Sequence, residues 1–188
     1  LSPGMAKLMK QGVVTNARKT IHPRKTLYTL AIGDQEYIDF INDNPAIESY
    51  PSSYVNCPCV IAQNDNLVSI NSALQVDFYG NVNAEFLGDH EFSGTGGHAD
   101  FVRGARLSKG GRSIIVMPSA TKGISKIVRK VDQVTTSRMD AEYVVTEYGC
   151  VNLLGLNNEQ RAKSLISIAH PDQRDELTRQ AKEIQLIS

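Results

Sequence analysis

Three short apolar segments stand out in the pattern of hydrophobic and polar positions: Arg112–Met117, Tyr143–Thr146 and Thr26–Ile32. Each is rich in β-branched or aromatic residues, and each is followed within three residues by glycine or proline. Arg112–Met117 contains four consecutive apolar residues. Apolar runs of this length are typical of strands that are covered on both faces. We therefore expect these three segments to form core strands.

Weaker strand signals lie between them. Leu67–Tyr79 begins with alternating apolar and polar residues, and Val82–Leu87 follows after the turn pair Gly80 and Asn81. This arrangement predicts a β-hairpin. Shorter strands are expected at Val60–Ala62, Ser125–Arg129 and Val134–Thr136.

Helices are indicated by apolar residues three and four positions apart, with a capping residue at most of the starts. Ser2, Asp34 and Asp172 are expected to cap three of them. The expected helices are Met5–Lys10, Asp34–Ile41, His98–Leu107, Glu159–Ala169 and Gln173–Ile184.

Strands interleaved with helices predict an α/β fold, with a largely parallel sheet, helices on both faces and a β-hairpin insertion. The length of 188 residues fits one domain, or one domain and a fragment, and residues 1–188 are interpreted as a single domain. In such sheets ligands bind beyond the carboxyl ends of the strands. Gly33, Pro118–Gly123 and Glu147–Gly149 follow three of the expected strands.

A glycine loop precedes the expected helix His98–Leu107. Gly94, Gly96 and Gly97 occupy three of four positions, which permits positive φ angles and close approach of a ligand to the backbone. The free N–H groups and the positive dipole end of the helix favour an anion, an oxyanion or a phosphate. The alternative is a tight strand-to-helix turn without a ligand. The full dinucleotide-binding spacing is absent.

Composition narrows the function classes. Twenty basic residues balance twenty acidic ones, which is not the basic excess of a nucleic-acid-binding protein. No apolar run approaches the roughly 20 residues of a membrane span, so neither nucleic acid nor membrane is an expected partner. Three cysteines form no disulfide framework, and Cys57 and Cys59 lack the second pair of a zinc site. We expect a cytoplasmic protein without metal.

Several polar residues are candidates for chemistry. Glu147 ends an apolar strand, where a carboxylate can be partly buried, although a structural ion pair or a cap is the plainer interpretation. Asn83 is placed to offer an amide to a ligand, whereas Asn81 also fits a turn. Lys122 begins a basic cluster beside Gly123 that either faces a phosphate or is simply solvated.

Ordered motifs along nearly the whole chain resemble the acetyl-CoA hydrolase/transferase family, and within it the 4-hydroxybutyrate CoA-transferases. The segments that carry the resemblance are Tyr54–Asn56, Asn64–Ser72, Gly80–Glu85, Ser93–Phe101, Val144–Gly149, Arg161–Ala162 and Ile168–Pro171. The resemblance is to the C-terminal domain of that family, which implies a CoA-transferase fold and a preceding domain of similar fold. His98 stands where the family usually has glutamine or serine, which leaves the choice of substrate open.

The resemblance implies that coenzyme A, as a substrate, moves between an acyl-CoA, such as acetyl-CoA or 4-hydroxybutyryl-CoA, and a carboxylic acid. A glutamate attacks the thioester and becomes a glutamyl-CoA thioester. The family's glutamate precedes the segment that resembles Ser2–Gly4, so the nucleophile is expected upstream of Leu1 and no catalytic residue is assigned within the chain.

The residues expected to bind substrate or CoA are Asn81, Asn83, Gly94, Gly96, Gly97, Lys122 and Gly123. The expected partners are the two substrates, the N-terminal domain of the parent chain and a second copy in a homodimer. The alternatives are an acetyl-CoA hydrolase and a non-catalytic CoA-binding or scaffold domain. A nucleotide-dependent dehydrogenase is poorly supported, because Gly33 lacks companion glycines.

Overall fold

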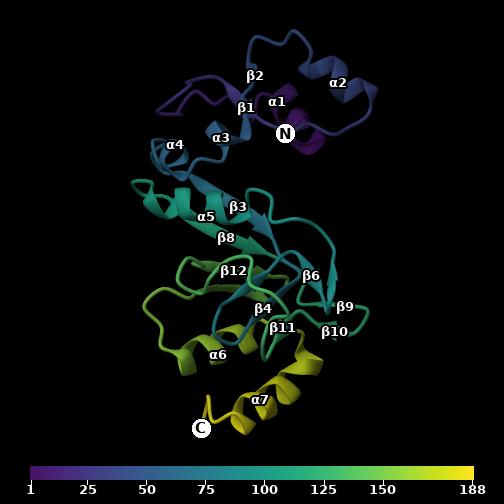
Figure 1. Ribbon diagram of the computed structural model, residues 1–188, viewed down its shortest axis with the longest axis vertical. Helices are drawn as coiled ribbons and strands as arrows, with labels where there is room; N and C mark the ends of the chain where they lie inside the picture. The colour runs from purple at the N-terminus through teal and green to yellow at the C-terminus, as the bar shows by residue number, and fades with distance from the viewer.

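The computed structural model describes all 188 residues, which form two lobes on either side of a cleft. Figure 1 shows residues 1–50, the N-terminal lobe, above residues 51–188, the main body, with the open side of the gap facing right. The N-terminus lies beside this gap, and the C-terminus lies at the opposite end of the molecule.

The N-terminal lobe contains two capped helices and one small sheet. Helix α1 (Pro3–Lys10) begins after Ser2, whose hydroxyl accepts a hydrogen bond from the N–H of Met5. Helix α2 (Gln35–Ile41) is capped in the same way by Asp34. Both predicted caps are confirmed. Strand β1 (Thr26–Tyr28) pairs in parallel with β2 (Ile47–Ser49).

The strand predicted at Thr26–Ile32 is therefore too long by four residues. Only Thr26, Leu27 and Tyr28 have partners in β2, because β2 itself is three residues long. Leu30 and Ile32 continue beyond the strand as exposed residues. An apolar segment without a neighbouring strand has no ladder to join, so the sequence pattern overstates its regular structure.

The main body is organised around a four-stranded sheet in the order β13-β12-β8-β3. Strands β3 (Val68–Ser72), β8 (Arg112–Val116) and β12 (Tyr143–Thr146) are mutually parallel. This confirms the predicted mixed α/β fold with a largely parallel sheet. Strand β13 (Gly149–Asn152) runs antiparallel to β12 and was not predicted.

Smaller strand pairs follow the carboxyl ends of the main sheet. The predicted hairpin exists as β4 (Gln75–Asp77) and β5 (Val82–Asn83), with Gly80 at φ +92° in the turn. The prediction of one long strand over Leu67–Tyr79 is wrong, because β3 pairs with β8 and the chain then turns before β4. The remaining short strands are β6 (Phe86–Leu87), β7 (His90–Glu91), β9 (Ala120–Thr121), β10 (Ile124–Ser125) and β11 (Ile127–Val128).

The helices of the main body are α3 (Ser52–Val55), α4 (Pro58–Ile61), α5 (His98–Leu107), α6 (Asn158–Ser167), the 3-10 turn η1 (Pro171–Gln173) and α7 (Arg174–Glu183). Helix α5 packs beside β3 and β8, whereas α6 and α7 lie beyond β12 at the other end of the sheet. The strand predicted at Val60–Ala62 is wrong, because Pro58 starts α4 there.

The predicted cap of the last helix is also wrong. Asp172 lies inside η1, and α7 begins after it at Arg174. The imidazole of His170 accepts a hydrogen bond from the N–H of Asp172 and thereby holds this turn. The predicted interruption between the last two helices is confirmed, since His170 and Pro171 begin the separate turn η1.

One hydrophobic core stabilises the main body. It unites 19 buried residues between Ala73 and Ile187, including Phe78, Ile115 and Leu165, and none of them belongs to the N-terminal lobe. The lobe therefore depends on the surface contacts that attach it to the rest of the chain.

Candidate functional site

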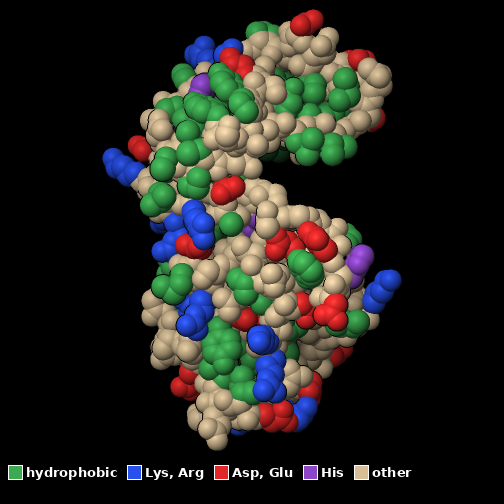
Figure 2. Space-filling view, viewed as in Figure 1, with side chains coloured by type: hydrophobic (Ala, Val, Ile, Leu, Met, Phe, Trp, Pro, Cys, Tyr) green, Lys and Arg blue, Asp and Glu red, His purple; other side chains and the backbone are tan.

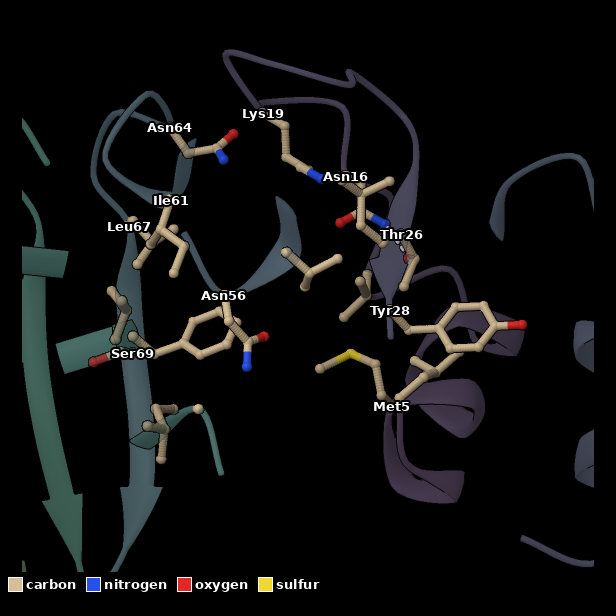
Figure 3. Close-up of a pocket in the computed structure, with 18 of the residues that line it drawn as sticks. Met5, Asn16, Lys19, Thr26, Tyr28, Asn56, Ile61, Asn64, Leu67 and Ser69 are labelled. Carbon is tan, nitrogen blue, oxygen red and sulfur yellow. Dashed lines mark hydrogen bonds between the residues drawn. The ribbon is translucent and has the colours of Figure 1, made fainter. Parts of the chain in front are cut away.

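A cleft of about 1670 Å³ separates the N-terminal lobe from the main body. Figure 2 shows it as a deep notch in the molecular surface, with apolar side chains gathered on the lobe above it. One wall comes from α1 and β1, and the other comes from β3, α4 and the start of α5. Figure 3 shows Thr26 and Tyr28 on one wall and Leu67 and Ser69 on the other.

The glycine loop lies at one end of this cleft. Gly97 and His98 line it, and Gly97 occupies the N-cap position of α5 without any side-chain cap. The N–H groups of the first helical turn are therefore not satisfied by a capping side chain. Gly96 has φ +54°, a conformation that glycine adopts readily and that bulkier residues disfavour. A Cβ atom at Gly94 or Gly96 would have no neighbour within 4 Å, so the loop is open on its outer side.

His98 is buried at the start of α5. Its Nδ1 lies 2.8 Å from the hydroxyl of Thr136. Burial lowers the pKa of His98 below its ordinary value of 6.5, whereas the Ser72 carbonyl and the Glu85 carboxylate act in the opposite direction. The net effect favours the neutral imidazole, which can donate from one nitrogen and accept at the other.

Unpartnered polar atoms gather where β3 meets α5. The Ser69 hydroxyl, the Asn71 amide nitrogen and Nε2 of His98 are buried and have no hydrogen-bond partner within the chain. All three residues line the cleft. Buried polar groups are nearly always hydrogen-bonded, so this cluster marks the end of the cleft at which polar partners are needed.

The two predicted asparagines are engaged inside the fold. The side chain of Asn83 is fully buried and donates to Oε1 of Gln75 and to the carbonyl of Phe86. The side chain of Asn81 donates to the Asp77 carboxylate and accepts from the N–H of Arg138. Both residues therefore fasten the β4–β5 hairpin, and neither lines the cleft.

Lys122 and Gly123 form the tip of the β9–β10 hairpin, with φ angles of +51° and +76°. The carbonyl of Gly123 accepts a hydrogen bond from Gln173 just before α7. Neither residue lines the cleft. The structure thus brings only Gly97, of the seven predicted residues, to the wall of the cleft, and the others surround the carboxyl edge of the sheet.

Glu147 follows β12 at this same edge. Its carboxylate accepts hydrogen bonds from the N–H and the hydroxyl of Ser119, at 2.8 and 2.7 Å. The hydrogen bond from the Ser119 side chain is the main reason that the pKa of Glu147 falls below its ordinary value of 4.5. The carboxylate is exposed and ionised at neutral pH, and it ties the ends of β8 and β12 together.

Asn56 was not among the predicted site residues, although it lies in one of the recognised motifs. It follows α3, lines the cleft and touches the glycine loop. A Cβ atom built on Gly97 would lie only 2.8 Å from Nδ2 of Asn56. Neither the spacing nor the composition around Asn56 signals this contact, because it depends on how α3 and α5 pack.

The structure contains no cluster of three or more histidine, cysteine, aspartate or glutamate side chains arranged to hold a metal ion. None of its helices has both the length and the apolar character of a membrane-crossing segment. The three cysteines Cys57, Cys59 and Cys150 are free thiols.

Comparison with known proteins places this geometry in context. Residues 33–181 match the model of the acetyl-CoA hydrolase/transferase C-terminal domain. The 4-hydroxybutyrate coenzyme A transferase of Clostridium kluyveri is 49% identical over 97% of the chain, which corresponds to 44% of that protein. The succinyl-CoA:cyclohexane-1-carboxylate CoA transferase of Geobacter metallireducens is 47% identical over the whole chain and 44% of its own length.

Among solved structures, RipA from Yersinia pestis is 53% identical and superimposes with a TM-score of 0.94. This match covers the whole chain and 43% of RipA. The chain therefore spans less than half the length of the relatives that it matches.

Proposed function

The chain belongs to the acetyl-CoA hydrolase/transferase family, and we propose that it is the C-terminal part of a CoA-transferase that moves coenzyme A between an acyl-CoA and a carboxylic acid. The observation that carries this proposal is the near end-to-end match, at 47–49% identity, to two enzymes named as CoA-transferases. Residues 1–188 then form the C-terminal domain of a longer, cytoplasmic parent.

The proposed reaction proceeds by covalent catalysis. A glutamate carboxylate, expected upstream of Leu1, attacks the thioester carbon of the acyl-CoA and releases the CoA thiolate, which leaves an acyl-glutamyl anhydride. The thiolate then attacks the glutamyl carbonyl and releases the first carboxylic acid, which leaves a glutamyl-CoA thioester. A second carboxylate attacks this thioester and repeats the two steps in reverse order.

The glycine loop would stabilise the negative oxygen that develops in each step. Oxyanions are stabilised by pre-positioned N–H groups, and the uncapped first turn of α5 presents such groups beside the cleft. Because Gly94, Gly96 and Gly97 have no side chains, the acyl group can approach the backbone. Asn56 packs against Gly97 and would hold the loop in place. In this proposal, the carboxyl edge of the sheet around the loop is formed by the β4–β5 and β9–β10 hairpins, which contain Asn81, Asn83, Lys122 and Gly123.

Hydrolysis is the second candidate, because relatives named acetyl-CoA hydrolase match 59–60% of the chain. In that case water would resolve the glutamyl intermediate in place of a second acid. Assay of the full-length protein with 4-hydroxybutyryl-CoA, with and without acetate, or with acetyl-CoA, with and without 4-hydroxybutyrate, separates the two. Acid-dependent formation of a new acyl-CoA supports transfer, and release of free thiol at the same rate without acid would contradict it.

The 188-residue chain by itself is expected to transfer no CoA, because the proposed nucleophile lies outside it. Glu147 is the internal carboxylate to test as a substitute. Incubation with acyl-CoA and acetate, followed by trapping with hydroxylamine, should give no adduct. A hydroxamate on Glu147, formed when hydroxylamine displaces CoA from a glutamyl thioester, or turnover that Glu147→Gln abolishes, would show that the nucleophile lies within this chain.

The role of the loop is tested in the full-length enzyme with Gly96→Val. The added side chain has open space but blocks approach to the backbone, so turnover should fall steeply while the rest of the fold remains. Gly88→Val is the matched control, because Gly88 also has a positive φ angle and no neighbour within 4 Å but lies in the β6–β7 turn. Equal turnover in the two variants would show that the glycine loop has only a structural role.

A further inference from the structure

Strand β3 is the edge of the four-stranded sheet and pairs only with β8. In this parallel pair Val68 lies opposite Arg112, whose N–H donates to the carbonyl of Leu67. Residues of a parallel strand bond alternately to one side and the other. The N–H and C=O groups of Val68, Ile70 and Ser72 therefore point away from β8, and Val68 and Ile70 line the cleft.

Strand β1 presents a similar edge from the opposite wall. The N–H of Thr26 donates to Ala46, and the carbonyl of Tyr28 accepts from Tyr50, so both residues bond toward β2. By the same alternation, the backbone groups of Leu27 and Thr29 point away from β2. Both residues line the cleft, and Figure 3 shows β1 facing β3 across it.

The side chains around these two edges are apolar and exposed. Ile32 is 72% exposed and Ile70 is 70% exposed, and Val68 and Leu30 are also exposed. All four line the cleft. An exposed, apolar strand edge is a template for pairing with another strand, and natural proteins normally cover it. The cleft is therefore bounded by two unpaired strand edges with exposed apolar side chains, as expected where a sheet lacks a strand.

We propose that the cleft is the socket of a β-strand, supplied by the segment that precedes Leu1 in the full-length protein, which pairs with the free edge of β3 and joins the two lobes through β1. The relatives are more than twice as long as this chain, so such a segment is available. Leu1 lines the cleft, and its amino nitrogen lies 2.7 Å from the carbonyl of Leu30. A preceding segment is thus attached at the opening of the socket.

This inference goes beyond the proposed reaction and does not depend on it. A strand paired with β3 would lie about 4.8 Å from it, in a cleft lined by more apolar than polar residues. The cleft would then be closed along most of its length, and the substrates would approach only at the carboxyl end, where Gly97 and the unpartnered polar groups lie.

Amide hydrogen exchange, assigned by NMR in the 188-residue chain and in the full-length protein, tests the socket. The outward-facing amides of Val68, Ile70 and Ser72 should exchange rapidly in the short chain and become protected at least 100-fold in the full-length protein. The amides of Ser69 and Asn71, which face β8, should be protected in both and serve as internal controls. Rapid exchange of all three outward amides in the full-length protein would overturn the proposal.

A second copy of the chain is the competing occupant. If it filled the socket, the outward amides of the short chain would become protected as its concentration rises, and a dimer would appear by sedimentation. Such a result would contradict the proposal, because the occupant would then be another molecule. Exchange that is independent of concentration in the short chain, together with protection in the full-length protein, supports it.

Ile70→Pro tests the pairing directly. Proline removes an N–H that points outward, so the β3–β8 pair of the short chain should be retained. In the full-length protein the same change should remove the protection of Val68 and Ser72. Ile70→Ala is the control, because it shortens the side chain and keeps the N–H. Protection in the full-length Ile70→Pro protein that equals the protection in Ile70→Ala would overturn strand pairing, and this readout is independent of CoA transfer.

Discussion

The two lobes differ in what stabilises them. The main body buries one continuous core in which Phe78, Ile115 and Leu165 are completely inaccessible to solvent. The N-terminal lobe buries only isolated residues such as Ala6, Tyr37 and Ile47, and it leaves Leu30 and Ile32 exposed. Its sheet has two strands of three residues, and two-stranded sheets of this size are marginally stable without packing partners.

The main body forms its own core and the lobe does not, as expected if the segment proposed to precede Leu1 completes the lobe. Regions with few buried contacts open locally at low free energy. We expect the lobe of the short chain to exchange amides and to be cleaved by proteases faster than the main body.

The largest effect is expected from the central core residue. Phe78→Ala should lower the free energy of unfolding of the main body by about 3–5 kcal/mol, because a fully buried aromatic ring leaves a cavity. Ile32→Ala in the lobe should change it by less than about 0.5 kcal/mol, since Ile32 is exposed. Chemical denaturation followed by circular dichroism measures both. Equal effects would show that the lobe and the main body share one core.

A glycine-to-alanine change is expected to act in opposite directions in the two lobes. In α5 a Cβ atom at Gly104 would lie 2.3 Å from Cγ2 of Ile61 in α4, so Gly104→Ala should destabilise the main body by about 1–3 kcal/mol. In α1 a Cβ atom at Gly4 meets only the Ser2 hydroxyl at 4.0 Å, so Gly4→Ala should stabilise the lobe by up to about 1 kcal/mol.

Ile61→Ala in the Gly104→Ala background provides the control for this pair. Removal of the opposing side chain should make the double variant more stable than the sum of the two single changes predicts. Thermal denaturation measures the coupling. Strict additivity would indicate that Gly104 is needed for a reason other than its contact with α4.

How far the sequence predicts the structure also differs between the lobes. In the main body, apolar runs predict β8 and β12 correctly, and the spacing predicts α5 and α6, since burial against one core produces clear patterns. In the N-terminal lobe the local caps Ser2 and Asp34 are predicted well. The strand at Thr26–Ile32 is not, because its length depends on partners rather than on its own residues.

The candidate site is predicted less completely than the fold. The glycine loop and the helix after it are local features, so the sequence identifies them. The contact between Asn56 and Gly97, the internal bonds of Asn83 and the free edge of β3 depend on residues that are distant in sequence. Side chains that look available for a ligand, such as Asn83, are engaged by partners that only the packing reveals.

The buried His98 should make the stability of the main body depend on pH. Because burial lowers its folded-state pKa below 6.5, the unfolded state binds the proton first, and stability falls as the pH decreases below 6.5 toward the folded pKa. His98→Gln should reduce this dependence between pH 7 and 5, measured by urea denaturation at several pH values. His22→Gln, which replaces a partly buried histidine of the N-terminal lobe that packs against Tyr50 and Tyr54, is the comparison. If His98→Gln leaves the change of unfolding free energy with pH unaltered, His98 is not the cause of the pH dependence.

The smallest effect is expected from the ion pair that fastens β2 to the loop before β1. Lys25 lies 2.9 Å from the Glu48 carboxylate, and their hydrogen bond is the main reason that the pKa of Glu48 falls below 4.5. A lowered carboxyl pKa stabilises the lobe above about pH 4.5, and this contribution is lost as the pH falls through the folded pKa.

Lys25→Gln should therefore speed amide exchange of Tyr50, whose N–H bonds to β1, at pH 6 but have less effect below the folded pKa of Glu48. Lys10→Gln removes the more exposed pair with Glu36, whose side chain is 83% exposed, and should change exchange in the lobe less. Exchange in the main body should not respond to either change. A response there of the same size would mean that the two lobes unfold as one cooperative unit, in contradiction to the difference between their cores.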